Sequence, residues 1–155
     1  MRYVIIGNSA AGISCAENLR KLHPSSRITI VSDENERAYS RCLISRFVDG
    51  RLKKEGLYFK PKSFYRDYGI EILLGHKIIE IEREKSRLLY ENSQEISYDK
   101  LLIATGSRAF RPDIEGLDLE GVHEFHSMND AENIVSRLKE VSQLQTVASY
   151  KESLL

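Results

Sequence analysis

Near its amino terminus the chain reads Tyr3-Val4-Ile5-Ile6-Gly7-Asn8-Ser9-Ala10-Ala11-Gly12-Ile13. Residues 3–6 have high β propensity and lead into a turn built from small residues. After the turn, apolar residues recur at the spacing of a helix, at Ile13, Ala16, Leu19 and Leu22. The sequence therefore predicts a strand, a tight turn and a helix in direct succession.

The predicted turn is suited to binding a phosphate group. The free backbone N–H groups and the positive dipole end of a helix N-terminus attract an anion. Gly7 would permit the turn, and Gly12 would let the helix pack on the strand. Ser9 stands where the middle glycine of G-x-G-x-x-G is usual, and its small hydroxyl could be tolerated there. With Ala10 and Ala11, these residues are the candidate phosphate contacts.

An acidic pair follows a second predicted strand. Residues 27–32 read as that strand, and Asp33 and Glu34 come directly after it. Asp33 lies 21 positions after Gly12 (33 − 12), near the spacing of about 20 at which an acid binds the ribose hydroxyls of a dinucleotide. A carboxylate there disfavours a 2′-phosphate, so FAD or NAD fits better than NADP. The alternative is a βαβ turn that binds no phosphate and precedes a solvated acidic loop.

Length and composition exclude several classes of protein. The 155 residues fit one ordinary domain, and Lys plus Arg equal Asp plus Glu at 23 each. The balanced charge gives no indication of nucleic acid or an anionic membrane as a partner. The chain has neither an apolar run near the roughly 18 residues of a membrane span nor the layout of a signal peptide, so we expect a cytoplasmic protein. Its two cysteines form no disulfide framework, and no metal-ligand spacing is present.

Two further motifs extend the pattern. The first is Tyr39-Ser40-Arg41-Cys42-Leu43-Ile44-Ser45, and the second is Tyr98-Asp99-Lys100-Leu101-Leu102-Ile103-Ala104-Thr105-Gly106-Ser107-Arg108. Together with the glycine turn and the acidic strand end, they resemble the N-terminal FAD-binding part of the pyridine nucleotide-disulfide oxidoreductase superfamily. Its rubredoxin and ferredoxin reductases, nitrite reductase flavin subunits and NADH oxidases are the most similar. The resemblance implies a Rossmann-like α/β FAD/NAD(P)-binding fold, with a parallel sheet and an inserted antiparallel β-meander.

The resemblance also implies roles for single residues. Arg41 matches a family arginine near the ribose and diphosphate of FAD. Arg46 stands where the family has a lysine near the flavin ring, and its alternative is a surface cation. Ile78 lies on a strand that supplies main-chain contacts to adenine in the family. At the end of the second motif, the resemblance implies that four residues contact FAD near its diphosphate and flavin: Ala104, Thr105, Gly106 and Arg108.

Cys42 replaces a proline that is usual in the reductase branch. In the oxidase and disulfide-reductase branch, a single redox cysteine lies at about this point beside the flavin, where a lowered thiol pKa makes it reactive. The alternative is a small apolar residue without redox chemistry, which the reductase-like neighbours favour. Cys42 is thus a candidate catalytic thiol.

The second half of the chain predicts several strands. Short segments with strand composition, predicted as antiparallel sheet, lie at residues 70–74, 77–82, 87–90 and 95–98. The apolar run in the second motif shows no alternation, which predicts a fully buried parallel strand.

The last part of the sequence predicts a short strand and a helix. Residues 121–125 read as the strand, and Asn129 or Asp130 as the cap of a helix that extends to about Glu140. A further strand is predicted to start at residues 146–148.

The resemblance covers about residues 1–148 and implies two domains. We expect residues 1–126 to form the N-terminal portion of an FAD-binding domain, and residues 127–155 a linker helix and the truncated start of an NAD(P)H-binding domain. The implied enzyme passes electrons from NAD(P)H through FAD to a redox protein, an iron centre, dioxygen or a disulfide, and this chain alone is expected to turn over little. Two alternatives stay open: a non-catalytic nucleotide-binding module that needs a complementing partner chain, and a small NAD-binding dehydrogenase.

Overall fold

The computed structural model describes residues 1–140 of the chain. These residues divide into two compact units, the first made of residues 1–40 and 54–107, the second of residues 41–53 and those from 108 on. The strand predicted at residues 146–148 lies outside the described residues. Among the helices of residues 1–140, none has the length and apolar character needed to cross a membrane.

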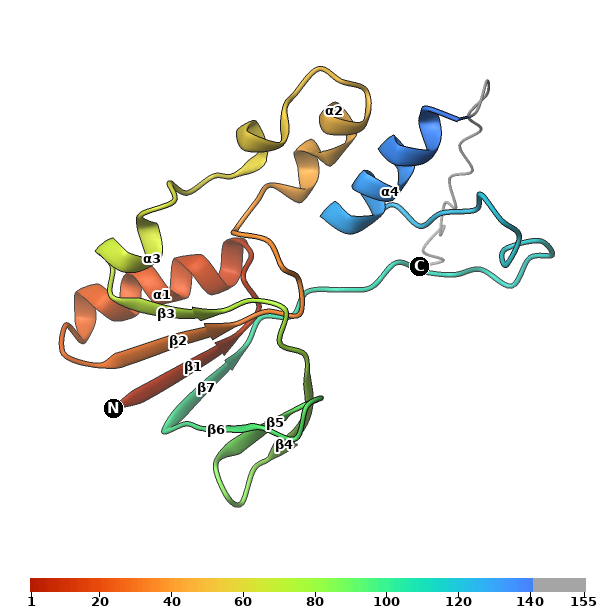
Figure 1. Cartoon of the computed structure of the whole chain (residues 1–155). Helices are drawn as coiled ribbons and strands as arrows, with labels where there is room; N and C mark the ends of the chain where they lie inside the picture. The colour runs from red at the N-terminus through yellow and green to blue at the C-terminus, as the bar shows by residue number, and fades with distance from the viewer. Residues whose placement is uncertain (141–155) are drawn as a thin grey trace, which may run out of the picture. The chain divides into compact units, whose positions relative to one another are not determined.

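The first unit is built on a four-stranded parallel sheet (Figure 1). The strands, in spatial order, are β3 (Ile70–Leu73), β2 (Arg27–Val31), β1 (Arg2–Ile6) and β7 (Lys100–Ile103). Helix α1 (Ala10–Leu22) connects β1 to β2. The predicted succession of strand, turn, helix and strand is confirmed.

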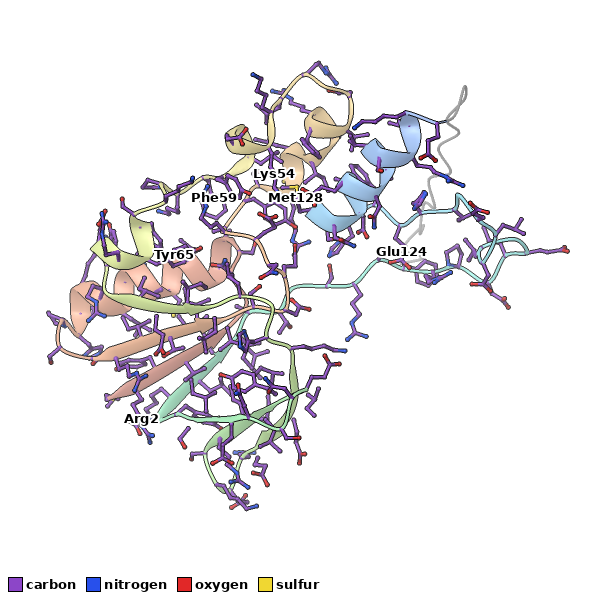
Figure 2. All side chains as sticks on the ribbon, viewed as in Figure 1. Arg2, Lys54, Phe59, Tyr65, Glu124 and Met128 are labelled. Carbon is purple, nitrogen blue, oxygen red and sulfur yellow. The ribbon has the colours of Figure 1, made fainter. Side chains whose placement is uncertain are left out.

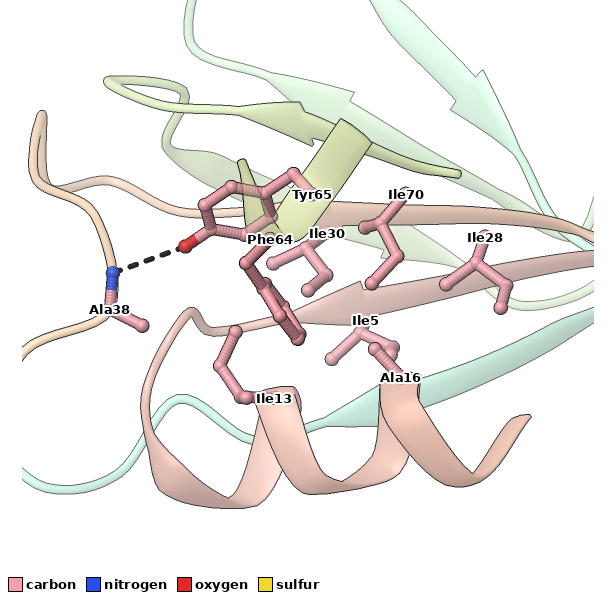
Figure 3. Close-up of a cluster of buried hydrophobic side chains, with 9 residues drawn as sticks. All are labelled: Ile5, Ile13, Ala16, Ile28, Ile30, Ala38, Phe64, Tyr65 and Ile70. Carbon is pink, nitrogen blue, oxygen red and sulfur yellow. Dashed lines mark hydrogen bonds between the residues drawn. The ribbon is translucent and has the colours of Figure 1, made fainter. Parts of the chain in front are cut away.

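Helices cover one face of this sheet. Ile5, Ile28 and Ile30 are all at most 1% exposed and pack with Ile13 of α1. The short helix α3 (Phe64–Asp67) adds Phe64 and Tyr65 to the same cluster, which Figure 3 shows between α1 and the strands. Every second residue of β1 and β2 therefore lies in a core beneath the helices, as the two-residue period of a strand requires.

An antiparallel meander covers the other face. It has the order β4 (Ile78–Glu82), β5 (Arg87–Tyr90) and β6 (Glu95–Ser97). Leu88 and Tyr90 of the meander are buried with Val4 and Val31 of the parallel sheet. Both faces of β1 and β2 are thus buried, which explains their nearly continuous apolar sequence. The predicted combination of parallel sheet and inserted antiparallel meander is confirmed.

Two polar contacts hold the far ends of these elements together. Arg2, labelled in Figure 2 on β1, donates from its backbone N–H to Asp99 Oδ2 at 2.7 Å, which joins β1 to the turn before β7. Arg20 of α1 donates to four backbone carbonyl oxygens, at 2.6 to 2.9 Å. These belong to Pro24, Ser26, Tyr68 and Gly69. One guanidinium therefore joins α1 to the start of β2 and the start of β3.

The second unit is helical. It contains the 3-10 turn η1 (Arg41–Leu43), α2 (Ile44–Val48) and α4 (Met128–Leu138). Helices α2 and α4 pack together, and Met128 and Ala131 of α4 are fully buried. A further 3-10 turn, η2 (Lys54–Leu57), belongs to the first unit.

Two strand predictions need correction. Residues 70–73 do not join the antiparallel sheet but pair with β2 in parallel. An alternating pattern does not reveal a strand's partner, and residues 32–69 supply the long crossover that a parallel partner needs. The strand of the second motif is parallel as predicted, but it is not fully buried. It has β1 as its one neighbour among the described residues, and Ile103 is 59% exposed.

The region before α4 also differs from the prediction. Residues 121–125 form no strand; Val122 N–H donates only to Leu119 O, a local turn contact at 3.2 Å. The cap of α4 is Ser127, whose side chain accepts from Asp130 N–H while the Asp130 carboxylate accepts from Ser127 N–H. This reciprocal capping box moves the helix start earlier than Asn129.

Candidate functional site

The turn after β1 is packed so closely that glycine is required at two positions. Gly7 has a φ of +117°, and a Cβ there would lie 2.1 Å from the carbonyl oxygen of Ala104. A Cβ on Gly12 would lie 2.0 Å from the carbonyl oxygen of Gly7. Both distances are far below any real Cβ contact, so the sequence prediction that these glycines permit the turn and the helix packing is supported by the geometry.

The turn leads directly into the N-terminus of α1. Ser9 is the N-cap, and its side chain makes no capping hydrogen bond. The first intrahelical bond runs from Ile13 N–H to Ser9 O at 2.9 Å, which leaves the N–H groups of Ala10, Ala11 and Gly12 at the free end of the helix. No acidic side chain lies in the first turn, and Ala10 and Ala11 are exposed. This end of α1 has the geometry and the charge that suit a phosphate group.

The acidic pair lies where β2 ends. Ser32 is buried and holds the strand end in place, since its N–H donates to Leu73 O at 2.9 Å and its carbonyl accepts from His76 N–H at 2.8 Å. Asp33 is exposed and Glu34 is half-buried. The Glu34 carboxylate accepts from the Tyr39 hydroxyl at 2.6 Å, so this carboxylate is oriented by the chain itself.

A second carboxylate anchors the loop that follows. Glu36 accepts from the Tyr58 hydroxyl at 2.6 Å and from Lys54 Nζ at 2.5 Å. Burial and the hydrogen bond to Glu36 raise the pKa of Tyr58 to about 12, so this hydroxyl keeps its proton at neutral pH. Tyr39 and Tyr58 also form an isolated antiparallel bridge. The loop after β2 is therefore fixed on the side that faces η2.

The third part of the site is the exit from β7. Ala104 N–H donates to Ile6 O at 2.8 Å, which extends the pairing of β7 with β1 up to the glycine turn. Thr105 and Gly106 beyond it are exposed, and Gly106 has a φ of +74° with open space around its Cα. Small residues here leave room at the strand end.

The topology brings these three parts to one edge of the sheet. Because β1, β2 and β7 are neighbouring parallel strands, their carboxyl ends lie side by side, and ligands of open α/β sheets bind outside such ends. The chain thereby assembles the predicted Gly7–Gly12 turn, the pair Asp33 and Glu34, and Ala104–Gly106. These residues fit the diphosphate and ribose of a dinucleotide.

Ile78 lies at the start of β4 and packs against the buried cluster that contains Val31, the last residue of β2. It is half-buried, pairs with Tyr90 and precedes a register shift between Ile78 and Glu80. An irregular ladder of this kind leaves main-chain groups available for other contacts. Its predicted role at adenine is not tested by the geometry.

Four predicted residues belong to the second unit. Arg41 Nη1 donates to the carbonyl oxygen of His126 at 2.9 Å. Cys42 is exposed and lines an open cavity of about 290 Å³ whose other lining residues are Arg41, Ile44, Ser45, Phe125 and His126. The side chains of Arg46 and Arg108 are exposed. Arg41 and Cys42 are thus brought to one cavity, whereas Arg46 and Arg108 are not part of it.

The other cysteine has a different setting. Cys15 is half-buried on α1 beside the first core cluster, and its burial raises the pKa of the thiol, which lowers the fraction present as the reactive thiolate. Within residues 1–140, no three His, Cys, Asp or Glu side chains are grouped so that they could hold a metal ion.

Two residues of the site were not singled out in the sequence. Asn8, inside the glycine turn, and Tyr65 of α3 hydrogen-bond to each other at 2.9 Å. Nothing in the sequence marks Tyr65 for this contact, because the spacing of residues along the chain does not show where a hydroxyl finds its partner. Asn8 carried one signal, a polar side chain between glycine and serine in a turn that otherwise needs small residues.

Comparison with known proteins places the chain in a family. The family model of the pyridine nucleotide-disulphide oxidoreductases matches residues 1–149. Among curated proteins, an NADH oxidase of Methanocaldococcus jannaschii is 32% identical over 146 residues, which cover 90% of this chain and 33% of that protein. A rubredoxin-NAD(+) reductase of Pseudomonas putida is 33% identical over 141 residues, covering 90% and 37%.

A solved structure gives the same result for the fold. An NAD-dependent persulfide reductase from A. fulgidus superposes with a TM-score of 0.82 at 30% identity, over 90% of this chain and 28% of that one. The Rossmann-like fold class is confirmed. The chain spans about a third of the length of the two curated relatives just described. Because the family model matches nearly all of its residues, the chain belongs to the pyridine nucleotide-disulphide oxidoreductase family.

Proposed function

We propose that the chain is the FAD-binding portion of an NAD(P)H-dependent flavin oxidoreductase. In such an enzyme, bound FAD accepts a hydride from the nicotinamide and passes electrons on singly or in pairs. Residues 1–126 form the N-terminal part of the FAD-binding domain in this proposal, and residues 127–155 begin the connection to the NAD(P)H-binding domain. We place this protein in the cytoplasm in the same proposal, because its two cysteines are free and the cytoplasm keeps thiols reduced.

One observation carries the proposal. The carbonyl of Gly7 and that of Ala104 lie where Cβ atoms on Gly12 and Gly7 would be, so the turn, α1 and the end of β7 meet with backbone against backbone. This contact places an uncapped helix N-terminus at the carboxyl edge of a parallel sheet, beside a strand that ends in an acid. A diphosphate bound to a ribose needs this combination of donors and acceptors.

The proposed roles follow from the chemistry of each group. The N–H groups of Ala10, Ala11 and Gly12 donate to the diphosphate, and the Ser9 hydroxyl adds a donor. Asp33 or Glu34 accepts from the ribose hydroxyls. The Tyr39 hydroxyl, 2.6 Å from the Glu34 carboxylate, sets the orientation of the second acid.

The remaining predicted contacts are proposed from the family resemblance. Thr105, Gly106 and Arg108 line the flavin and diphosphate side, Arg41 and Arg46 supply positive charge, and Ile78 contributes its main chain to adenine. Because Arg46 carries a planar guanidinium instead of the ammonium group of lysine, it presents its charge in a different geometry. Replacing any of these contacting side chains by mutagenesis should weaken FAD binding, which a measured dissociation constant would show.

The electron acceptor is proposed as a class. Relatives with matching sequence are named for rubredoxin and for ferredoxin, so we propose a small redox protein as the partner. Cys42 is proposed as a redox thiol because it is exposed in the same cavity as Arg41. A Cys42→Ser variant that keeps disulfide-reducing or oxidase activity in the complete enzyme would exclude this role.

The experiment is a binding titration with FAD, followed by absorption spectroscopy after desalting. Retained flavin absorbance supports the proposal. Gly12→Val and Asp33→Ala should weaken binding, with a factor of about ten to a hundred for Asp33→Ala, because hydrogen bonds to a charged group contribute about 1.5 to 3 kcal/mol. Asp113→Ala, a change at an exposed acid outside the site, is the matched control and should bind as the wild type does.

A second candidate function is favoured by a specific observation. Five large apolar side chains between residues 110 and 125 are 45% to 68% exposed: Phe110, Ile114, Leu119, Val122 and Phe125. Exposed apolar side chains gathered in one stretch indicate a surface that another part of a protein covers. A nucleotide-binding module that acts only with a complementing chain would have this property. Turnover with NADH that appears only after such a chain is added would select this function.

A further inference from the structure

The amide of Asn8 holds the glycine turn to the loop after β2. Its Nδ2 donates to the carbonyl oxygen of Glu36 at 3.1 Å, across 28 positions of the chain. Its Oδ1 accepts from the hydroxyl of Tyr65 at 2.9 Å. Both ends of this amide are therefore used, and neither contact lies within the turn itself.

The hydroxyl of Tyr65 reaches the same loop from the other side. It accepts from the backbone N–H of Ala38 at 3.1 Å, the hydrogen bond that is drawn in Figure 3. Tyr65 is 6% exposed and Ala38 is 1% exposed, so the hydrogen bond between them is shielded from water. One hydroxyl and one amide thus connect three segments: the turn at residues 7–12, the loop at residues 33–38 and α3.

We propose that Asn8 and Tyr65 are positioning residues for a bound dinucleotide. They hold the diphosphate-binding turn and the ribose-binding loop at the separation that one ligand spans. The inference rests on the proposed function, since it assigns a role to residues that surround the proposed FAD site. Neither side chain is assigned a contact with the ligand.

The physical reason is preorganisation. Loops that must be ordered during binding lower the affinity, because the entropy lost in ordering them opposes association. The turn is already rigid through its glycine contacts, and the far side of the loop is anchored through Glu36. Within residues 1–140, the side chains of Asn8 and Tyr65 connect these two rigid parts. Phenylalanine would fill the same volume as Tyr65 but could not make either hydrogen bond.

The test compares Tyr65→Phe with Tyr68→Phe. Each change removes one tyrosine hydroxyl, and the two tyrosines are near each other in the sequence. Tyr68 is the control because its hydroxyl makes no hydrogen bond within residues 1–140. Dissociation constants are measured for FAD and for ADP, which carries the ribose and diphosphate without the flavin. For Tyr65→Phe we expect both ligands to bind about five- to tenfold more weakly, the effect of one or two lost hydrogen bonds. Tyr68→Phe should bind both as the wild type does.

A double-variant cycle tests whether the two residues act together. Asn8→Ala and Tyr65→Phe should each weaken FAD binding, and the combined variant should be no weaker than the worse single variant. Multiplied effects would mean that the residues act separately, which overturns the proposal. Asn8→Ala is tested by itself if Tyr65→Phe does not fold.

Other outcomes also have a fixed meaning. A Tyr65→Phe protein with lower stability but unchanged affinity for FAD and ADP would show a purely structural role and overturn the inference. A loss seen with FAD but not with ADP would place the effect at the flavin end and overturn it too. Wild-type protein that binds neither ligand would instead refute the proposed function, so the two failures are distinguishable.

Discussion

Adding one methyl group at Gly12 tests the close packing on which the candidate site depends. In the Gly12→Ala protein, the new Cβ would lie 2.0 Å from the Gly7 carbonyl oxygen, whereas ordinary contact begins at 3.4 Å. Helix α1 and the turn would therefore have to separate by about 1.4 Å. Ile13 and Ala16, which are buried next to Gly12 on the same helix, would move out of the core with it.

The sign of the stability change separates two effects. In an open helix position, replacing glycine with alanine stabilises by about 1 kcal/mol, because alanine has the higher helix propensity. Overpacking a rigid site costs about 1 to 3 kcal/mol. The atom in contact is a backbone oxygen that cannot rotate away, so we take the upper end of this range. The expected result is a net loss of about 2 kcal/mol in the free energy of unfolding.

Urea unfolding followed by far-ultraviolet circular dichroism measures this change, since the chain has no tryptophan to report by fluorescence. Ser14→Ala is the control, because Ser14 is an exposed residue of the same helix. Ser14→Ala should raise the free energy of unfolding by a few tenths of a kcal/mol, because alanine has a higher helix propensity than serine. A Gly12→Ala protein as stable as the wild type, or more stable, would refute the reasoning that the turn and helix meet backbone to backbone.

Three other changes have defined outcomes. Arg20→Lys should lower the free energy of unfolding by about 2 to 4 kcal/mol in the same assay, since an ammonium group cannot reach all four carbonyl oxygens; a loss under 1 kcal/mol would contradict this. Tyr90→Phe should leave stability unchanged or raise it by about 1 kcal/mol, because the buried Tyr90 hydroxyl has no hydrogen-bond partner within residues 1–140. A clear loss in urea melts would show that the hydroxyl has a partner. For Asp130, burial opposes the charged form, but hydrogen bonds from Ser127 and His126 outweigh it and lower the carboxyl pKa. In the unfolded chain this carboxyl titrates near pH 4. The carboxylate therefore stabilises α4 above that pH, and the stabilisation is lost as the pH falls through the lower pKa of the native state. Titration by nuclear magnetic resonance should show the shift shrinking in Ser127→Ala; an unchanged midpoint would argue against the capping box.

The local elements of the first unit could be predicted with good accuracy. The β-branched run at residues 3–6, the small-residue turn and the apolar spacing of residues 13–22 each act over a few neighbours, and β1 and α1 form where they predict. The acid at the end of β2 was likewise found by its spacing from the glycine turn. The composition of residues 77–98 predicted antiparallel strands there, and the family resemblance added that they form an inserted meander.

Errors arose where a segment's partner decides its structure. Residues 70–73 have the composition of any strand, and only their position next to β2 makes them parallel. Residues 121–125 have strand-like residues but no neighbour that pairs with them in the described chain, so they form none. The start of α4 was misplaced because Ser127 and Asp130 cap it reciprocally, which requires the folded geometry.

The sequence by itself determined the strand, turn and helix at the start of the chain, the acid that follows, and the family to which they belong. Those signals are local, since they depend on backbone conformations that a few adjacent residues prefer or permit. Tertiary structure alone decided that Gly7 must approach Ala104, and that Asn8 and Tyr65 meet although 57 positions separate them. Contacts of this kind depend on how separate elements pack against each other. The pattern of residues along one element does not specify which other element it will contact.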